Sequence, residues 1–147
     1  LRRTRALQEQ YIAWGSRSIG MKTILVDAIN GLILEDGTVF KEMQALLDSY
    51  PNRKIVLTGA NDEQFKKFNL DKRPYEVFTL KHDPEKSDVK YWYILLEKYN
   101  LKPEDTVYFE HNKQAAETAQ SVGVPTYFYD HTKEDLAALK GYIDNKL

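Results

Sequence analysis

The fold is decided by residues 23–31, which read Thr23-Ile24-Leu25-Val26-Asp27-Ala28-Ile29-Asn30-Gly31. An apolar, β-branched run ends here on an aspartate and then on small, turn-forming residues, a pattern that predicts a short buried strand followed by a turn. In an open α/β sheet, ligands bind just beyond the carboxyl ends of the strands. Asp27 is therefore the first candidate for chemistry, because its strand would stay buried while its carboxylate meets a substrate.

Five short runs of apolar and β-branched residues predict buried strands. They lie at Thr23–Val26, Lys54–Leu57, Glu76–Leu80, Thr106–Phe109 and Thr126–Tyr129. Apolar residues at three-and-four spacing predict helices that follow the later runs, and Thr132 with Asp135 resembles a capping pair for the last helix. Strands that alternate with helices imply right-handed crossovers and a mainly parallel sheet. The expected fold class is therefore α/β, in three layers.

A second local pattern follows Asp27 directly. Glu35-Asp36-Gly37 separates two short apolar runs, residues 32–34 and 38–40, and this arrangement predicts a small hairpin. We expect it to form a flexible flap beside the site.

Composition limits the class of protein. With 147 residues, of which 42% are hydrophobic and 29% charged, the chain can build one ordinary core, which we assign to residues 21–147. The net charge of -1 gives no general attraction to nucleic acid or to an anionic membrane, and no apolar stretch approaches the roughly 20 residues that span a bilayer. The chain has no cysteine, which is compatible with the cytoplasmic setting that we expect.

Residues 1–20 differ from the rest of the chain. They carry four arginines against one acid, Glu9, and they lack the apolar centre of a secretory signal. Since Met21 is followed by the first predicted strand, we expect residues 1–20 to form a weakly ordered extension rather than a working basic arm.

Polar side chains follow several of the predicted strands. Asp27 ends the first strand, Thr58 the second and Glu110 the fourth, while Lys86 precedes the helix that leads into the fourth. Such a set suits phosphoryl transfer, in which one carboxylate attacks phosphorus, a hydroxyl and an ammonium bind the equatorial oxygens, and a second carboxylate helps to hold Mg²⁺. The sequence therefore predicts that these four side chains converge at one edge of the sheet.

This ordered set resembles the haloacid dehalogenase-like (HAD) hydrolase superfamily, from Met21 to the end of the chain. The resemblance implies a three-layer, Rossmann-like HAD fold with a five-stranded, mainly parallel sheet and no large cap. It further implies that Asp27 is the nucleophile, that Thr58 and Lys86 are catalytic, and that Mg²⁺ is held by Asp27, Glu110 and the carbonyl of Ile29. The implied activity is metal-assisted hydrolysis of a phosphate ester through an aspartyl intermediate.

Two positions depart from the pattern of that superfamily. Its phosphatases usually carry a second aspartate two residues after the nucleophile, where it protonates the leaving group and later activates water; here that residue is Ile29. General acid–base help is worth about a hundred- to ten-thousand-fold in rate, so we expect reduced competence. The usual pair of adjacent acids is Glu110-His111, and we expect weaker or rearranged Mg²⁺ binding because Mg²⁺ prefers oxygen ligands.

Several alternatives stay open. Lys81 and Lys90 compete with Lys86 as the site lysine, and His82 and His131 are interpreted as surface loop residues. The dehalogenases of the superfamily also lack the second aspartate, but the short intervals in this chain leave no room for the helical cap that they generally need. A phosphoacceptor receiver domain is disfavoured because its acceptor aspartate belongs on a later strand.

The main competitor to a hydrolase is a non-catalytic HAD-like module that binds a partner or regulates one. The partner expected in either case is a phosphorylated small molecule or macromolecule, and neither a membrane nor a nucleic acid is expected. Members of that superfamily without a cap tend to act on macromolecules or to use a neighbouring subunit as a lid. A homo-oligomer is therefore kept as one of the alternatives.

Overall fold

The computed structural model describes residues 21–147, which fold around a five-stranded sheet in the order β3-β2-β1-β4-β5. The strands are β1 (Thr23–Asp27), β2 (Lys54–Thr58), β3 (Glu76–Thr79), β4 (Thr106–Glu110) and β5 (Thr126–Phe128). All four neighbouring pairs are parallel, and β1 lies in the middle between β2 and β4. The predicted α/β fold is confirmed, while the extension predicted for residues 1–20 lies outside the described residues.

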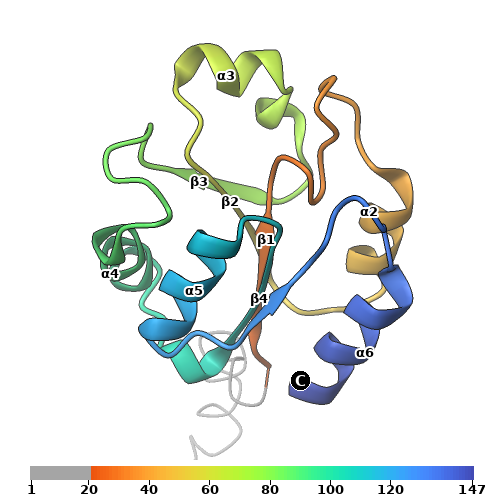
Figure 1. Ribbon diagram of the computed structural model, residues 1–147, viewed down its shortest axis with the longest axis vertical. Coiled ribbons are helices and arrows are strands. Elements are labelled where there is room, and N and C mark those ends of the chain that lie inside the picture. Colours follow the sequence, from red (N-terminus) through yellow and green to blue (C-terminus); the bar gives the residue numbers. More distant parts are fainter. Residues whose placement is uncertain (1–20) are drawn as a thin grey trace, which may run out of the picture.

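The helices cover both faces of the sheet, which gives three layers (Figure 1). One face carries α2 (Lys41–Asp48) and α6 (Leu136–Lys146), and the other carries α4 (Val89–Lys98) and α5 (Lys113–Ser121). The short α3 (Asp62–Lys67) lies instead beyond the carboxyl end of β2. Two 3₁₀ turns, Leu70–Lys72 and Pro103–Asp105, complete the regular structure of the described residues.

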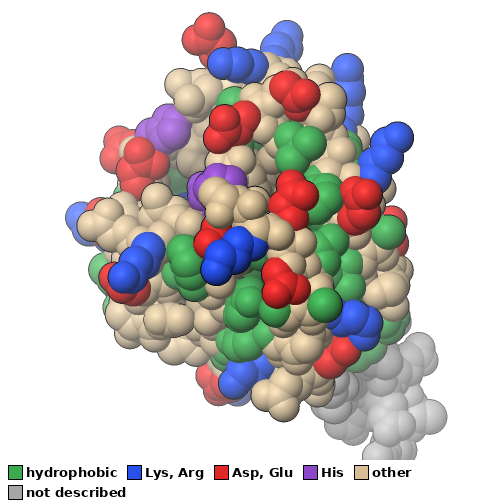
Figure 2. All heavy atoms as spheres, turned by 45° about the vertical axis from the view of Figure 1, so that its right-hand side comes forward, with side chains coloured by type: hydrophobic (Ala, Val, Ile, Leu, Met, Phe, Trp, Pro, Cys, Tyr) green, Lys and Arg blue, Asp and Glu red, His purple; other side chains and the backbone are tan. Residues whose placement is uncertain are grey.

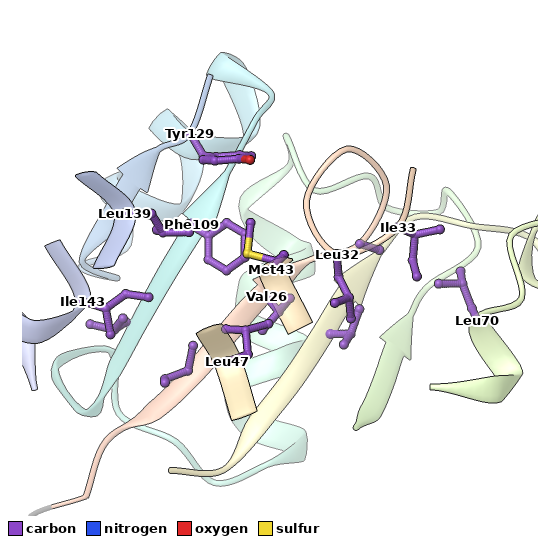
Figure 3. Packing of buried hydrophobic residues seen from close by; sticks show 14 of the residues in the cluster. Val26, Leu32, Ile33, Met43, Leu47, Leu70, Phe109, Tyr129, Leu139 and Ile143 are labelled. Atoms are coloured by element: carbon purple, nitrogen blue, oxygen red, sulfur yellow. The ribbon is translucent and has the colours of Figure 1, made fainter. Parts of the chain in front are cut away.

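Strand residues alternate between two separate cores, because successive side chains of a strand point to opposite faces of the sheet. On β1, Ile24 and Val26 join the core beneath α2 and α6, whereas Leu25 joins the core beneath α4. Figure 3 shows Phe109 of β4 and Met43 of α2 in the first core, with Leu139 and Ile143 of α6 beside them. Burial on both faces explains why β1 reads as a continuous apolar run.

The second core is rich in aromatic residues that also make polar contacts. Trp92 packs edge-on against Tyr108, with ring centroids 5.0 Å apart, and its indole Nε1 donates a hydrogen bond to the carbonyl of Lys86 over 2.9 Å. The hydroxyl of Tyr91 donates to the carbonyl of Thr58 over 2.9 Å. The core beneath α4 thereby fixes the backbone at two of the predicted site residues.

Helix starts follow the expected capping chemistry, with one correction. The side chain of Asn112 accepts from the amide of Ala115 and caps α5. Asp135 alone caps α6, through the amide of Ala138, so the predicted pairing of Thr132 with Asp135 is wrong. Thr132 donates instead to the carboxylate of Asp130, a local turn contact that competes with capping.

The segment after β1 is less regular than predicted. The expected hairpin is reduced to a single antiparallel bridge between Ile33 and Val39. Leu32 and Ile33 are fully buried in the core, and the side chain of Asn69 donates to the carbonyl of Gly37 over 3.1 Å. Residues 32–40 are therefore anchored at their base and at their turn, and they do not line the pocket described below.

A large cap is absent from residues 21–147. The segment between β1 and β2 holds the bridge above and α2, which packs on the sheet, and the segment between β2 and β3 holds the six-residue α3 and the 3₁₀ turn Leu70–Lys72. In the same part of the chain, no helix is long and apolar enough to cross a membrane. Figure 2 shows a face on which acidic and basic side chains are mixed, without a broad area of one sign.

Candidate active site

Asp27 lies at the carboxyl end of the central strand and is only 1% exposed. Its Oδ1 accepts a hydrogen bond from the ammonium of Lys86 over 2.8 Å. Its Oδ2 accepts from the backbone amide of His111 over 2.9 Å and lies 2.5 Å from Nδ1 of the same residue. Both oxygens of the predicted nucleophile are thus held by groups from two other segments.

Lys86 is the lysine that reaches this carboxylate. Its Nζ lies 2.8 Å from Oδ1 of Asp27 and 2.8 Å from Oε1 of Glu110, so one ammonium bridges two carboxylates. Lys81 pairs with Asp62 over 3.0 Å, and Lys90 is exposed on α4. Among the three lysines considered from the sequence, only Lys86 has the contacts that the prediction required.

Glu110 is fully buried at the end of β4, beside Asp27. Its Oε1 accepts from Lys86 and from the hydroxyl of Tyr108, and its Oε2 accepts from the backbone amide of Asn112 over 2.9 Å. These donors come from the loop before α4, from β4 itself and from the residue that caps α5, and together they fix the plane of the carboxylate. The structure therefore brings Glu110 to the place that its position in the sequence predicted.

His111 contributes more than the sequence indicated. Besides facing Asp27, its Nδ1 lies 3.4 Å from Oε2 of Glu110, and the edge of its ring packs on His131 with centroids 5.1 Å apart. His131 is a loop residue, as interpreted, but it abuts the site. The contact between His111 and Asp27 spans 84 residues of sequence, and no local pattern could reveal it.

The charges of this cluster set its protonation. Burial alone would raise the pKa of Asp27, but Lys86 and His111 outweigh it and hold the pKa well below its ordinary value. Burial and the neighbouring Asp27 raise the pKa of Glu110, while Lys86 opposes them. Burial lowers the pKa of Lys86, but the two carboxylates outweigh it and raise this pKa above its usual range. Asp27 is consequently ionised at neutral pH, which is the form that can attack an electrophile.

Thr58 and Ile29 both line the pocket above Asp27. The Oγ1 of Thr58 accepts a hydrogen bond from the amide of Ala60 over 3.1 Å, which leaves its own proton free to donate. Ile29 is an apolar residue of the pocket lining, at the position where the resemblance noted from the sequence implies an acid. That the carbonyl of Ile29 binds a metal stays a prediction, and so do the catalytic roles of Thr58 and Lys86.

The pocket is an open cavity of about 350 Å³. Its floor is formed by the strand ends, and its walls come from α3, the loop that carries Lys86 and the start of α5. Phe68 and Ala115 supply apolar surface, while Asn112 and Gln114 supply polar groups. A cavity with a few convergent polar groups is the usual form of a small-molecule site.

His82 forms part of the wall, which the sequence did not reveal. Its Nε2 lies 2.6 Å from Oε1 of Gln64, an oxygen that already accepts from the amide of Asn61, and its Nδ1 lies 3.0 Å from Oε1 of Glu85. His82 and the preceding Lys81 also adopt positive φ values of 67° and 56°, which non-glycine residues seldom do.

Three side chains of the site, from Asp27, Glu110 and His111, lie close enough together to bind one divalent cation. Oxygens of Asp27 and Glu110, together with a ring nitrogen of His111, lie within 4.8 Å of one another. Two carboxylates suit Mg²⁺, which prefers oxygen ligands, whereas an imidazole nitrogen suits transition metals. The carboxylates present therefore fit Mg²⁺, and the third group does not favour it.

Comparison with solved structures shows a shared fold. A variant of a HAD family enzyme from Bacteroides thetaiotaomicron, in complex with magnesium and inorganic phosphate, matches with a TM-score of 0.67 and 14% identity, over 82% of this chain and 99% of that chain. An uncharacterized protein from Corynebacterium glutamicum matches with a TM-score of 0.60 and 13% identity, over 85% and 96% of the two chains.

A third match is the core domain of a candidate phosphoglycolate phosphatase from Streptococcus pneumoniae. Its TM-score is 0.55 at 19% identity, over 84% of this chain and 96% of that chain. No family model matches the sequence. No curated protein matches it either. The likeness is thus one of fold, at sequence identities too low to carry residue roles from one chain to the other.

Proposed function

We propose that this chain, which has the haloacid dehalogenase-like fold, hydrolyses phosphate esters through an aspartyl-phosphate intermediate on Asp27, with reduced competence because Ile29 replaces the usual acid. The observation that carries the proposal is the pairing of Asp27 with Lys86 at the floor of an open cavity. The HAD neighbour that binds magnesium and inorganic phosphate supports a phosphorylated substrate, either a small molecule or a macromolecule.

In the proposed first step, a carboxylate oxygen of Asp27 attacks phosphorus, and the bond between phosphorus and the ester oxygen breaks. The ester oxygen leaves with the bonding electrons, and the phosphoryl group becomes attached to Asp27. Lys86 and the hydroxyl of Thr58 bind the equatorial oxygens, whose charge they offset. Water then attacks phosphorus, the bond between phosphorus and the Asp27 oxygen breaks with its electrons left on the carboxylate, and inorganic phosphate leaves. One proton of that water passes through solvent to the oxyanion that departed in the first step.

A divalent cation fits the same site. The carboxylates of Asp27 and Glu110, with the carbonyl of Ile29, would hold Mg²⁺, whose positive charge reduces repulsion between an anionic nucleophile and an anionic substrate. Lys86 supplies part of that charge from the protein itself, since it lies between the two carboxylates.

The side chain of Ile29 determines which esters react. It cannot protonate the departing oxygen, so the leaving group departs as an oxyanion and only stable oxyanions leave readily. We therefore expect aryl phosphates with acidic phenols to react and alkyl phosphates to react poorly. Hydrolysis of an aryl phosphate, measured with and without Mg²⁺, tests the function; Asp27→Asn is expected to reduce the rate to background while the far-UV circular dichroism spectrum stays unchanged.

Ile29→Asp tests the cause of the reduced competence. Restoring a carboxylic acid at this pocket position is expected to raise turnover of alkyl phosphates by about a hundred-fold or more, the usual worth of general acid–base catalysis. Ile29→Asn is the matched control, because it adds a polar group of similar size that cannot transfer the proton in the same way. Equal background rates in the parent and in Asp27→Asn would overturn the hydrolase proposal.

A non-catalytic binding module is the second candidate, and one observation favours it. Both oxygens of Asp27 are already occupied by Lys86 and His111, as in a structural ion-pair network. This candidate predicts that a phosphorylated ligand or partner binds to the parent and to Asp27→Asn alike. A phosphatase also binds substrate, so the module is supported only if binding persists while hydrolysis stays at background in the parent.

A further inference from the structure

The two buried carboxylates of the site present two distinct pairs of oxygens. Oδ1 of Asp27 and Oε1 of Glu110 face the ammonium of Lys86, at 2.8 Å each. Oδ2 of Asp27 and Oε2 of Glu110 face Nδ1 of His111, at 2.5 Å and 3.4 Å. One side of the carboxylate pair therefore carries a fixed cation of the protein, and the other carries a nitrogen donor.

The second side has the properties of a prepared site. The backbone amide of His111 donates to Oδ2 of Asp27, and that of Asn112 donates to Oε2 of Glu110, each over 2.9 Å. Hydrogen bonds of this kind orient metal-binding carboxylates and sharpen their affinity. The side chain of His111 is 23% exposed at the cavity, so an ion can enter, whereas the two carboxylates are almost fully buried.

The ligand chemistry of this side differs from that of an all-oxygen site. Carboxylate and water ligands suit Mg²⁺, whereas imidazole suits Zn²⁺, Co²⁺ and other first-row transition metals. Tight, near-octahedral oxygen coordination is what Mg²⁺ demands, and a ring nitrogen at the third corner does not provide it. Replacement of an acid by His111 thus changes the kind of ion that the site accepts, beyond any weakening of its affinity.

We infer that Asp27, Glu110 and Nδ1 of His111 form a site for a divalent transition-metal ion, with Zn²⁺ or Co²⁺ bound in preference to Mg²⁺. Binding displaces the proton that Nδ1 of His111 shares with Asp27, the ring moves back to admit the ion, and it keeps its other proton on Nε2. The inference rests on the proposed function, because the ion lies at the proposed nucleophile. It fails separately from that function, since a metal can bind at these residues whether or not an ester is hydrolysed.

Binding is measured first, without reference to activity. Titration of the metal-free full chain with Zn²⁺ and with Mg²⁺ by calorimetry gives the ratio of the two affinities. In His111→Asp, which returns an oxygen ligand to this corner, we expect the preference for Zn²⁺ over Mg²⁺ to fall by at least about tenfold, within the range typical of changes at a metal site. His131→Asn is the matched control, because this ring packs on His111 without being one of the three donors, and the ratio is expected to stay unchanged.

The ligand atom is identified by nuclear magnetic resonance of ¹⁵N-labelled histidine. The chain has three histidines, so the variants His82→Asn and His131→Asn assign the signals. On addition of Zn²⁺, the Nδ1 signal of His111 is expected to shift, while the signals of His82 and His131 keep the pattern of a ring that binds no metal.

Three results would overturn the inference: no binding of Zn²⁺ by the parent, an equal preference for Zn²⁺ in the parent and in His111→Asp, or a shift confined to His82 or His131. The outcome for the proposed function is read separately from aryl phosphate hydrolysis. If Zn²⁺ binds at His111 but no ester is hydrolysed, this inference stands and the hydrolase proposal fails. If hydrolysis depends on Mg²⁺ and the site shows no preference for Zn²⁺, the hydrolase proposal stands and this inference fails.

Discussion

Lys86 donates to Asp27 across 59 residues of sequence, and the pair is almost completely removed from solvent, with side chains 14% and 1% exposed. The same ammonium contacts the buried Glu110, so two carboxylates depend on one cation. The first prediction concerns the loss of that cation.

Lys86→Met is expected to lower the free energy of unfolding by about 3 to 5 kcal/mol, because it leaves buried charges uncompensated. Urea denaturation followed by circular dichroism measures the change. Lys90→Met is the matched control: this lysine lies four residues away on α4 and is exposed, so its replacement is expected to change stability by less than about 0.5 kcal/mol. Similar losses in the two variants would show that Lys86 does not hold the carboxylates together.

Tyr108 gives a second prediction, since its fully buried hydroxyl donates to Oε1 of Glu110. Tyr108→Phe removes a hydrogen bond to a buried acid and is expected to lower the free energy of unfolding by about 1.5 to 3 kcal/mol, the range for bonds to charged groups. Tyr93→Phe is the control at an exposed position of α4, and denaturation midpoints should barely change there. A small effect at Tyr108 would mean that other donors satisfy Glu110.

Gly141 lies inside α6, where a Cβ atom added to this residue would meet no other atom within 4 Å. Gly141→Ala is therefore expected to raise the free energy of unfolding by about 0.5 to 1 kcal/mol, because alanine has less backbone freedom to lose in a helix. Thermal unfolding measures the gain as a higher midpoint.

Gly31→Ala is the contrasting change. A Cβ atom at Gly31 would lie 2.3 Å from the carbonyl oxygen of Asp27, so the backbone that carries the nucleophile would have to move. We expect a loss of stability together with a chemical-shift change at Asp27. Unaltered shifts there would contradict the close approach.

Tyr129 supplies a prediction for pH. Its side chain is 1% exposed, and its hydroxyl finds no hydrogen-bond partner among residues 21–147. Burial and neighbouring acids raise the pKa of Tyr129 to about 12, from an ordinary value near 10. The folded protein therefore keeps this proton where the unfolded chain loses it, so the contribution to stability is present below pH 10 and is lost as the pH rises towards 12.

Tyr129→Phe is expected to preserve stability at pH 7 or to raise it by up to about 1 kcal/mol, because it removes a buried group that lacks a partner. It should also make the decline in stability between about pH 10 and pH 12 less steep, because these are the pKa values of the unfolded and the folded chain. Denaturation curves at a series of pH values test both statements. A clear loss of stability at pH 7 would reveal a partner for the hydroxyl.

The strand ends could be predicted from the sequence because each is a local pattern. An apolar run that stops at Asp27, and another that stops at Glu110, places two carboxylates at one edge of a parallel sheet, where the structure shows them side by side. Burial on both faces makes such runs easy to recognise.

The pocket walls could not be predicted, because they depend on contacts between distant segments. His82 contacts Gln64 across 18 residues of sequence. Its positive φ is a backbone conformation that the presence of a histidine does not predict. The hairpin prediction failed in part for a similar reason. The two apolar runs around Glu35-Asp36-Gly37 are a local pattern, but tertiary packing buried Leu32 and Ile33 and left a single antiparallel bridge.

The central position of β1 has a consequence for how the molecule opens. With β2 on one side and β4 on the other, its amide protons are expected to exchange with deuterium only when the whole sheet separates. The wall is different, because α3 has no buried residue and spans only six positions. Brief local openings of α3 can therefore widen or close the cavity while Asp27 stays fixed. The position of the carboxylate depends on the stability of the whole sheet, whereas the cavity wall around a ligand can change without unfolding of the sheet.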